Sequence, residues 1–548
     1  MHRMERLFND HWEFVKLPNG STLCDTQSAA WKPVDLPHDF LIYQENALYE
    51  NADGWYRRVL DVPAQWLDKS VILRFDGVYM DCDVLLNGEV ICTHHYGYTC
   101  FDADLTGKLQ AGANVLHVHI RHQSPNSRWY SGAGIFRDVT LHVLNTRHIA
   151  LDGIYLSTKR SGDDWTLTIQ TELTGSGTEH PVLHRLLLHD VVVCETAAMV
   201  NGDQALAVMT IPSPTLWQVG KGGCYTLETT FGDQVIRENV GFREIEMTTD
   251  RGLFVNGSPV KLHGVCLHHD LGCLGSAFNV HAAARQLTAM KEMGVNSLRT
   301  SHNPPARQVM ELCDEMGILV IDELLDMWQH PKTTYDYARF FDTDVEADVA
   351  AWVRRDRNHP SLLMWSIGNE IGDTNTHPEQ AGKVTQMLVE NVRRHDPECN
   401  APTTIGSNYM PWKGAQHCAQ FIDVVGYNYG ESLYAKHHAE HPEWMIYGSE
   451  TASTVSSRGV YRFPMQAPIL ADDDLQCSSL ANSNTSWGTQ NVAKMIVDDL
   501  NCGYSLGQYI WTGIDYIGEP TPYHTRNSYF GAMDTCVFPK DYWYLLFQ

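Results

Sequence analysis

The first half of the chain follows a short alternating pattern of apolar and polar positions. The segments 70–91 (SVILRFDGVYMDCDVLLNGEVI) and 115–122 (VLHVHIRH) both alternate in this way. A period of two is typical of strands with one buried face. The dipeptide Asn87-Gly88 supplies the positive φ angles of a tight hairpin turn. We therefore predict a β-sandwich over residues 1–146.

A second block of strand-like runs occupies residues 147–247. The runs are 164–173, 185–195 and 225–242, and Gly232-Asp233 divides the last of them as a candidate hairpin turn. About 100 residues with this spacing are typical of a small immunoglobulin-like sandwich. We predict such a domain here.

From residue 248 the pattern alternates between strand and helix. The strand candidates are 260–269, 296–302, 318–323, 362–370, 402–407, 421–429, 445–450 and 505–516. The helix candidates between them include 305–317, 378–396 and 279–294, the last with Asn279 as N-cap and Gly294 as C-cap. Eight repeats favour a closed (β/α)8 barrel over 248–548. The alternative is a doubly wound open sheet, but no G-x-G-x-x-G follows the first strand.

Charge and cysteine usage narrow the class of protein. The 548 residues include 40 Lys and Arg and 66 Asp and Glu, for a formal charge of −26. This charge repels nucleic acid and anionic membranes, so we expect neither as a partner. No apolar stretch approaches the length of a transmembrane helix, and the first residues lack the apolar region of a signal peptide. The 14 cysteines form no C-x-x-C pair, which favours reduced thiols and a cytoplasmic location, with secretion as the alternative.

Polar residues at the carboxyl ends of the predicted barrel strands are the candidates for chemistry, because the active sites of such barrels lie there. These residues are His268, His269, Arg299, His302, Asp322, Glu323, Asp326, Trp328, Asn369, Glu370, Asn428, Tyr429, Glu450, Trp511 and Asp515. Glu370 and Glu450 end strands four and seven, on opposite sides of the mouth. Two facing carboxylates suit double displacement at an acetal carbon. The alternative is that each is a solvated carboxylate at a strand end.

Several segments also carry a family resemblance. DRNHPSLLMWSIGNE (356–370) resembles the acid/base signature of glycoside hydrolase family 2. NSLRTSHNPP (296–305) with DEMGILVIDE (314–323) resembles its other signature, with Asn303 where Tyr is usual. GWYRR (54–58), SRWYSGAGIFRDV (127–139), YGSETAS (447–453) and GEPTPY (518–523) are similar to the family too. The resemblance implies a jelly-roll sugar-binding-like domain, an immunoglobulin-like domain and a catalytic TIM barrel.

The resemblance also implies roles for individual residues. It makes Glu370 the general acid/base and Glu450 the nucleophile, with Asn369 on the sugar 2-hydroxyl, Tyr429 and Arg299 on the nucleophile, His268 and His302 on sugar hydroxyls, and Trp511 as the apolar floor. Asp326 and Trp328 are expected to line the subsite, and no catalytic role is assigned to Glu519. The alternatives are a structural ion pair for Arg299, a core imidazole for His268 and barrel packing for Trp511.

Departures from the family pattern bear on metal and substrate. Met327 and Gln329 occupy the positions of the magnesium ligands of the large bacterial β-galactosidases, so we expect no essential metal and no cofactor. The β-glucuronidase branch has an Asn-x-Lys pair for the sugar carboxylate, and here Tyr529 follows Asn527 at the Lys position. Arg526 and Lys540 are the alternative cations for such a carboxylate.

The predicted activity is therefore that of a retaining exo-β-glycosidase acting on terminal β-D-galactosides. A β-glucuronidase or β-galacturonidase is the second candidate, and a non-catalytic carbohydrate-binding protein is the third. We expect a carbohydrate as substrate and allow for a homo-oligomer. The chain stops in what should be the last barrel helix, so we expect a fragment of a longer protein, and the alternative is a compact three-domain enzyme.

Overall fold

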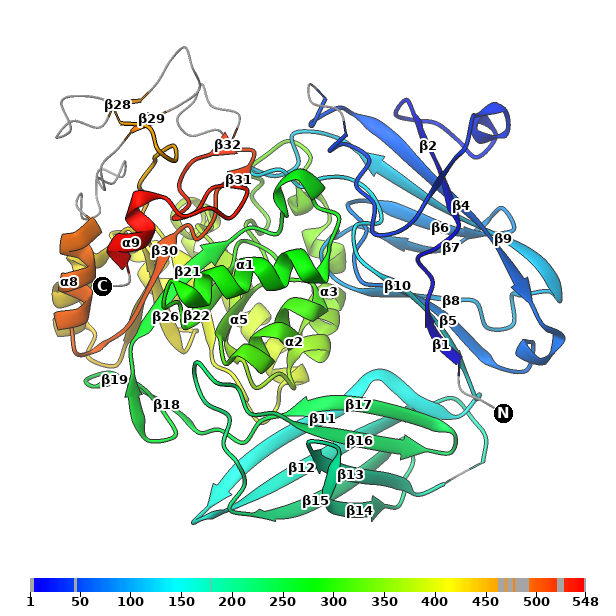
Figure 1. Ribbon diagram of the computed structural model, residues 1–548, viewed down its shortest axis with the longest axis horizontal. Helices are drawn as coiled ribbons and strands as arrows, with labels where there is room; N and C mark the ends of the chain where they lie inside the picture. The colour runs from blue at the N-terminus through cyan, green and yellow to red at the C-terminus, as the bar shows by residue number, and fades with distance from the viewer. Residues whose placement is uncertain are drawn as a thin grey trace.

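The computed structural model describes residues 4–43, 47–178, 180–461, 492–519 and 527–546, together with two short strands at 469–470 and 477–478. Figure 1 shows two sheet-rich units packed against a larger barrel. The first unit lies on the right of the view, the second at the bottom, and the barrel with its helices fills the rest.

The first unit is a sandwich of two antiparallel sheets. One sheet has the order β1 (Met4–Leu7), β10 (Val139–Leu144), β5 (Ser70–Phe75) and β8 (Phe101–Asp104). The other has the order β3 (Lys32–Val34), β2 (Trp12–Leu17), β4 (Ala52–Val62), β9 (Gly112–His122), β6 (Cys82–Leu86) and β7 (Glu89–His94). Asn87 and Gly88 form the hairpin turn between β6 and β7 with φ angles of 51° and 90°, which confirms that prediction. The apolar positions of both sheets meet in one core.

The second unit is a smaller sandwich. One sheet contains β11 (His148–Ser161), β12 (Asp164–Thr174) and β15 (Gln204–Pro212). The other contains β14 (Val191–Ala198), β13 (Val182–Leu188), β16 (Tyr225–Phe231) and β17 (Gln234–Val240). Gly232, at φ 60°, lies in the turn between β16 and β17, as the sequence predicts. A three-stranded sheet of β18 (Ile245–Thr248), β19 (Gly252–Val255) and β20 (Ser258–Val260) leads from this unit into the barrel.

The third unit is a closed barrel of eight parallel strands, as predicted. In order they are β21 (Leu262–Leu267), β22 (Ser297–Thr300), β23 (Leu319–Glu323), β24 (Leu362–Asn369), β25 (Thr403–Ser407), β26 (Val424–Asn428), β27 (Met445–Ala452) and β30 (Ser505–Trp511). Strand β24 is buried along its whole length because the barrel interior covers one face and helices cover the other. The open-sheet alternative is thereby excluded.

Helices cover the outside of the barrel (Figure 1). They are α1 (Val280–Glu292), α2 (Arg307–Met316), α3 (Phe341–Asp356), α4 (Asp373–Thr376), α5 (Pro378–His395), α6 (Lys413–Cys418), α7 (Tyr434–Glu440), α8 (Val492–Asn501) and α9 (Asp541–Leu546). Asn279 caps α1, since its side chain accepts hydrogen bonds from the backbone N–H groups of His281 and Ala282. Gly294 follows that helix with φ 87°, as expected for a glycine at a helix end.

The eighth strand is shorter than predicted. It ends at Trp511, whereas the sequence indicates a strand as far as 516. The backbone N–H groups of Thr512 and Gly513 donate to Phe530 and Cys266, so the chain turns across the mouth of the barrel. Tyr516–Ile517 then forms β31, which pairs with β32 (Asn527–Ser528) outside the barrel.

One carboxylate joins all three units. Asp152, at a bulge in β11, pairs with Arg74 of the first sandwich at 2.7 Å and with Arg307 of α2 at 3.2 Å. Burial alone raises the pKa of this carboxyl, but the two guanidinium groups outweigh it and hold the pKa far below its ordinary value. The second unit is therefore fixed to both neighbours through one charge.

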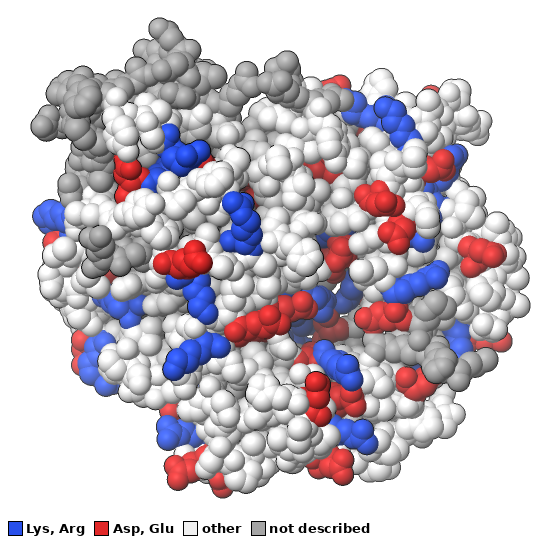
Figure 2. Space-filling model, viewed as in Figure 1, with Lys and Arg blue, Asp and Glu red and all other residues white. Residues whose placement is uncertain are grey.

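Two properties of the whole molecule complete this description. Among the described residues, none of the helices has the length and apolar character needed to cross a bilayer. Figure 2 shows acidic and basic side chains interspersed over the face that it presents. The acidic excess of the sequence is thus not collected into one broad patch on that face.

Candidate active site

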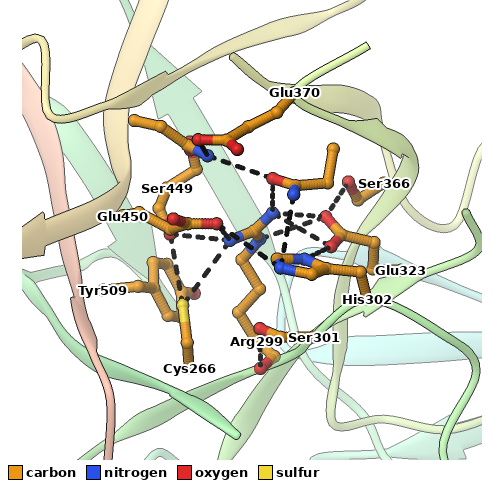
Figure 3. A network of polar contacts seen from close by, with 12 residues as sticks. Cys266, Arg299, Ser301, His302, Glu323, Ser366, Glu370, Ser449, Glu450 and Tyr509 are labelled. Atoms are coloured by element: carbon orange, nitrogen blue, oxygen red, sulfur yellow. Dashed lines mark hydrogen bonds and ion pairs between the residues drawn. The ribbon is translucent and has the colours of Figure 1, made fainter. Parts of the chain in front are cut away.

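Four of the predicted site residues, Arg299, His302, Glu370 and Glu450, lie close together at the carboxyl ends of the barrel strands (Figure 3). Glu370 directly follows β24, where its backbone N–H donates to the carbonyl of Gly406 at 2.8 Å. Glu450 lies near the end of β27. Glu370 and Tyr429 adopt φ angles of 45° and 55°, which non-glycine residues rarely adopt and which cost about 1 kcal/mol or more each. Backbone strain of this kind is common where side chains must be aimed at a ligand.

Glu450 is a buried carboxylate held by two donors. Arg299 Nη1 donates to its Oε1 at 2.9 Å, and the Tyr429 hydroxyl donates to its Oε2 at 2.8 Å. The side chain is only 4% exposed. Burial, together with the nearby charge of Glu370, raises the pKa of Glu450 to about 7, although Arg299 and Tyr429 oppose this rise.

Glu370 is more open to solvent, with 14% of its side chain exposed. Asn428 Nδ2 donates to its Oε1 at 3.2 Å, and Arg128 Nη1 lies 3.7 Å from its Oε2. The same Asn428 amide donates to the Asn369 side chain at 3.0 Å. Glu370 and Asn369, adjacent in sequence, are therefore positioned by one shared donor.

The predicted contact between Arg299 and the nucleophile position is present, within a wider network. The Arg299 guanidinium is fully buried and also bonds Glu323 and the Asn369 side chain. His302 Nδ1 lies 2.6 Å from Glu323 Oε1. The ion-pair alternative for Arg299 is thus also realised, through Glu323 on β23, in the same side chain.

Aromatic rings form one wall of the site. The ring of His302 stacks on Trp511, with centroids 5.3 Å apart and planes 5° from parallel. His268 packs edge-on against both rings. Neither ring nitrogen of His268 has a hydrogen-bond partner among the described residues, and burial holds the pKa of both imidazoles well below its ordinary value. Two neutral imidazoles and one indole are therefore packed against one another in this wall.

Asp326 is the centre of a second charged group. It accepts hydrogen bonds from Arg128 at 2.8 and 3.1 Å, from Lys332 at 2.7 Å and from Asn369 at 2.9 Å. Burial disfavours its charge, but these two cations outweigh burial and lower the pKa of Asp326 strongly. Arg128 also reaches Glu519 at 3.3 Å.

The segment after β23 contains Trp328 and the two residues at the magnesium positions, Met327 and Gln329. The Trp328 side chain is fully buried and donates to the carbonyl of Ile367 at 2.9 Å, so the structure places it in the packing behind the site. The residues at the magnesium positions do not fit that ion, since Met327 is an apolar thioether and the Gln329 amide donates to Asp342 at 2.7 Å.

The structure also brings residues to the site to which the sequence assigns no role. Glu323 and Asn428 were recognised only as polar strand ends, and Lys332 follows β23 by nine positions in a loop. Arg128 and Trp129 come from the first sandwich, where Trp129 packs on the rings of His268 and His302. The sequence signal for these two was the family-like segment 127–139, which does not indicate where its side chains point.

Two segments of the chain match the family models of known enzymes. Residues 17–145 match the sugar binding domain of glycosyl hydrolases family 2, and residues 245–451 match the TIM barrel domain of that family. The β-galactosidase BoGH2A of Bacteroides ovatus is 35% identical over 98% of this chain and 71% of its own length. Human β-glucuronidase is 25% identical over 90% of this chain and 80% of its own.

A crystal structure of a β-glycosidase from Bacteroides vulgatus superposes with a TM-score of 0.85 at 28% identity, covering 99% of this chain and 74% of that one. Both family domains, a relative above 30% identity and a matching solved architecture agree with one another. The chain is a glycoside hydrolase and belongs to glycosyl hydrolases family 2.

Proposed function

We propose that this chain is a retaining exo-β-glycosidase that hydrolyses terminal β-D-galactosides by double displacement. The observation that carries the proposal is the unequal pair of carboxylates at the mouth. Glu450 is buried and held by a guanidinium and a phenol, whereas Glu370 is partly exposed and held by an amide. Two carboxylates in different surroundings can hold opposite protonation states at one pH.

In the first step, Glu450 attacks the anomeric carbon while Glu370 donates its proton to the leaving glycosidic oxygen. In the second, Glu370 takes a proton from water, which attacks the same carbon and releases Glu450. In this mechanism Asn369 forms a hydrogen bond with the sugar 2-hydroxyl, and this bond strengthens in the transition state. His268 and His302 supply nitrogens for other hydroxyls, and Trp511 offers an apolar face to the ring.

A neutral sugar suits the charge balance of the site. Within the described part of the mouth, Arg299 pairs with Glu323 and Glu450, while Arg128 and Lys332 pair with Asp326. None of these cations is available for a sugar carboxylate without breaking an existing pair. The similarity to BoGH2A, a β-galactosidase, supports the same substrate.

A β-glucuronide or β-galacturonide is the second candidate, because β-glucuronidases are also among the relatives of this chain. Of the two alternative cations for the uronate, Lys540 is buried and its ammonium bonds Asp515 at 2.6 Å. Arg526 lies outside the described residues. Tyr529 stands where a carboxylate-binding Lys would be expected.

A panel of nitrophenyl β-glycosides tests the substrate. Fastest turnover of the galactoside supports the proposal, and fastest turnover of the glucuronide or galacturonide replaces it with the second candidate. No turnover on galactoside, uronides, glucoside or mannoside favours the carbohydrate-binding alternative. Proton NMR of the first product tests the mechanism, since initial β-anomer indicates retention and initial α-anomer excludes double displacement.

Variants of the two glutamates test their roles. Glu450→Gln should lower turnover of every substrate at least about a thousandfold, because no nucleophile remains. Glu370→Gln should retain far more activity on dinitrophenyl than on alkyl glycosides, since a good leaving group needs little acid help. An equal loss on both leaving groups would contradict the role of Glu370.

A further inference from the structure

Glu323 is a third carboxylate in the network that holds the two carboxylates of the proposed mechanism. Its side chain, at the end of β23, is fully buried. Oε1 accepts from Arg299 Nη2 at 2.9 Å and lies 2.6 Å from His302 Nδ1. Oε2 accepts from Arg299 Nη2 and Nε at 2.7 and 3.1 Å and from Ser366 Oγ at 2.6 Å. Both oxygens are therefore fully used by protein donors.

This set of partners identifies the form of the side chain. Arg299 can only donate, the Ser366 hydroxyl donates in this contact, and an ionised carboxylate can only accept. A bidentate Arg–carboxylate pair also fixes the guanidinium plane. These donors favour the ionised carboxylate, although burial raises the pKa of Glu323 above its ordinary value. The bidentate pair with Arg299 determines how the guanidinium is oriented.

The orientation of Arg299 decides which of its nitrogens face Glu450 and Asn369. Figure 3 shows Glu323 and Glu450 on opposite sides of the guanidinium. With Nε and Nη2 bound to Glu323, Arg299 presents Nη1 to Glu450 at 2.9 Å and Nη2 to Asn369 at 2.9 Å. The positive charge of Arg299 is therefore shared by two carboxylates. Arg299 donates more hydrogen bonds to Glu323 than to Glu450.

Glu323 also sets the state of His302. Because a carboxylate faces Nδ1, this nitrogen carries the proton and donates it, and Nε2 of the neutral ring is left as an acceptor. Nε2 lies 3.8 Å from Glu450 Oε1 and 3.3 Å from Asn369 Nδ2. A sugar hydroxyl placed there can donate to the imidazole.

We infer that Glu323 is a positioning residue that tunes the nucleophile, by retaining part of the Arg299 charge and by fixing His302 as a hydrogen-bond acceptor. This inference rests on the proposed function of Glu450. Its chemical sense is that a nucleophile paired fully with Arg299 would be too well stabilised to attack the anomeric carbon. The divided cation keeps Glu450 ionisable near neutral pH and still reactive.

The charged and titratable groups that face Glu450 are few enough to make a clear test. They are Arg299 and His302 from the β22 side, Cys266 from β21, Glu370 after β24 and Tyr429 after β26. Glu323 acts on Glu450 through Arg299 from β23. Removing its charge leaves the other groups in place.

The test is the pH profile of kcat/KM for Glu323→Gln, Glu323→Asp and Ser366→Ala on the best nitrophenyl glycoside. In Glu323→Gln, Arg299 serves Glu450 alone, so the acidic limb should move to lower pH by about one unit, and kcat should fall. Glu323→Asp keeps the charge and Ser366→Ala removes only a neutral donor, so both should leave the limb in place. Thermal unfolding confirms that each variant is folded.

An unmoved acidic limb in folded Glu323→Gln overturns the inference, because a purely structural role would lower the rate without moving the limb. Absence of turnover by the unchanged enzyme overturns the proposed function instead.

A second readout does not need turnover. It is a 13C NMR titration of labelled glutamate side chains, in which the Glu450 signal is assigned by its loss in Glu450→Gln. Titration of Glu450 at lower pH in Glu323→Gln supports the inference, and an unchanged midpoint refutes it.

Discussion

Replacing the buried carboxylate Glu450 by glutamine should make the protein more stable at neutral pH, even though it removes activity. Burial raises the pKa of Glu450 from 4.5 to about 7 in the folded protein. Since each pKa unit corresponds to about 1.4 kcal/mol, this difference lowers the free energy of unfolding by about 3 kcal/mol once both states are ionised.

The sign of the effect follows from proton binding. At pH 4 and below, Glu450 is largely protonated in both states and costs nothing. Between pH 4.5 and 7 the unfolded chain releases the proton while the folded chain holds it, so the free energy of unfolding falls as the pH rises. Above pH 7 the full cost is present. Glutamine has the same shape without the charge, so Glu450→Gln should remove that cost.

Thermal unfolding followed by circular dichroism at pH 4.5 and pH 7.5 provides the assay. We expect Glu450→Gln to unfold at a higher temperature than the unchanged protein at pH 7.5 and at a similar temperature at pH 4.5. Glu390→Gln, on the exposed face of α5, is the matched control and should show no such pH dependence. Equal differences between Glu450→Gln and the unchanged protein at both pH values would refute the reasoning.

Other charged contacts give further predictions. Arg128→Met removes a partner of Asp326 and a neighbour of Glu370, so steady-state kinetics should show kcat/KM reduced by about a hundredfold; an unchanged value would mean that the first sandwich contributes nothing to catalysis. Asp152→Asn breaks the charge that joins the three units and should cost about 2 kcal/mol in thermal unfolding, and no loss would show that apolar contacts suffice there. Lys540→Met leaves the buried Asp515 without its cation and should cost about 3 kcal/mol at pH 8, with a smaller loss at pH 5, where Asp515 takes up a proton; an equal loss at both would exclude the charge as the cause.

The barrel could be predicted from sequence because its strands are buried on both faces. The run 362–370 is apolar apart from Ser366 until it ends in Asn369 and Glu370, so the sequence indicates both the strand and its functional end. Helix α3 was not predicted, although Phe341, Val345, Val349 and Trp352 recur at helical spacing and are buried. The first turn of α3 contains Asp342 and Asp344, and a long loop precedes it, so the helical spacing of its apolar residues is weakly marked in the sequence.

The sequence predicts the site residues that lie at the ends of barrel strands. It does not predict those that only the tertiary structure brings to the site. The rule of strand ends gave Glu370, Glu450, Arg299 and His302, because parallel strands bring these positions to one end of a barrel. Trp328 obeys the same rule but is directed into the packing by its bond to Ile367. The position of a residue at a strand end fixes where its backbone lies, but it does not fix the direction in which the side chain points.

The contribution of the first sandwich follows from contacts of very long range. Arg128 pairs with Asp326 and Glu519, which lie 198 and 391 positions away in the chain. Arg137 of the same segment donates to the carbonyl of Pro304 at 2.7 Å, which fixes this segment against the loop that carries His302. Arg128, the cation beside both Glu370 and Asp326, comes from outside the barrel. Without it, Lys332 would be the one cation paired with Asp326 among the described residues. We therefore expect the sandwich to contribute to the active site through Arg128 and not to be only an attached module.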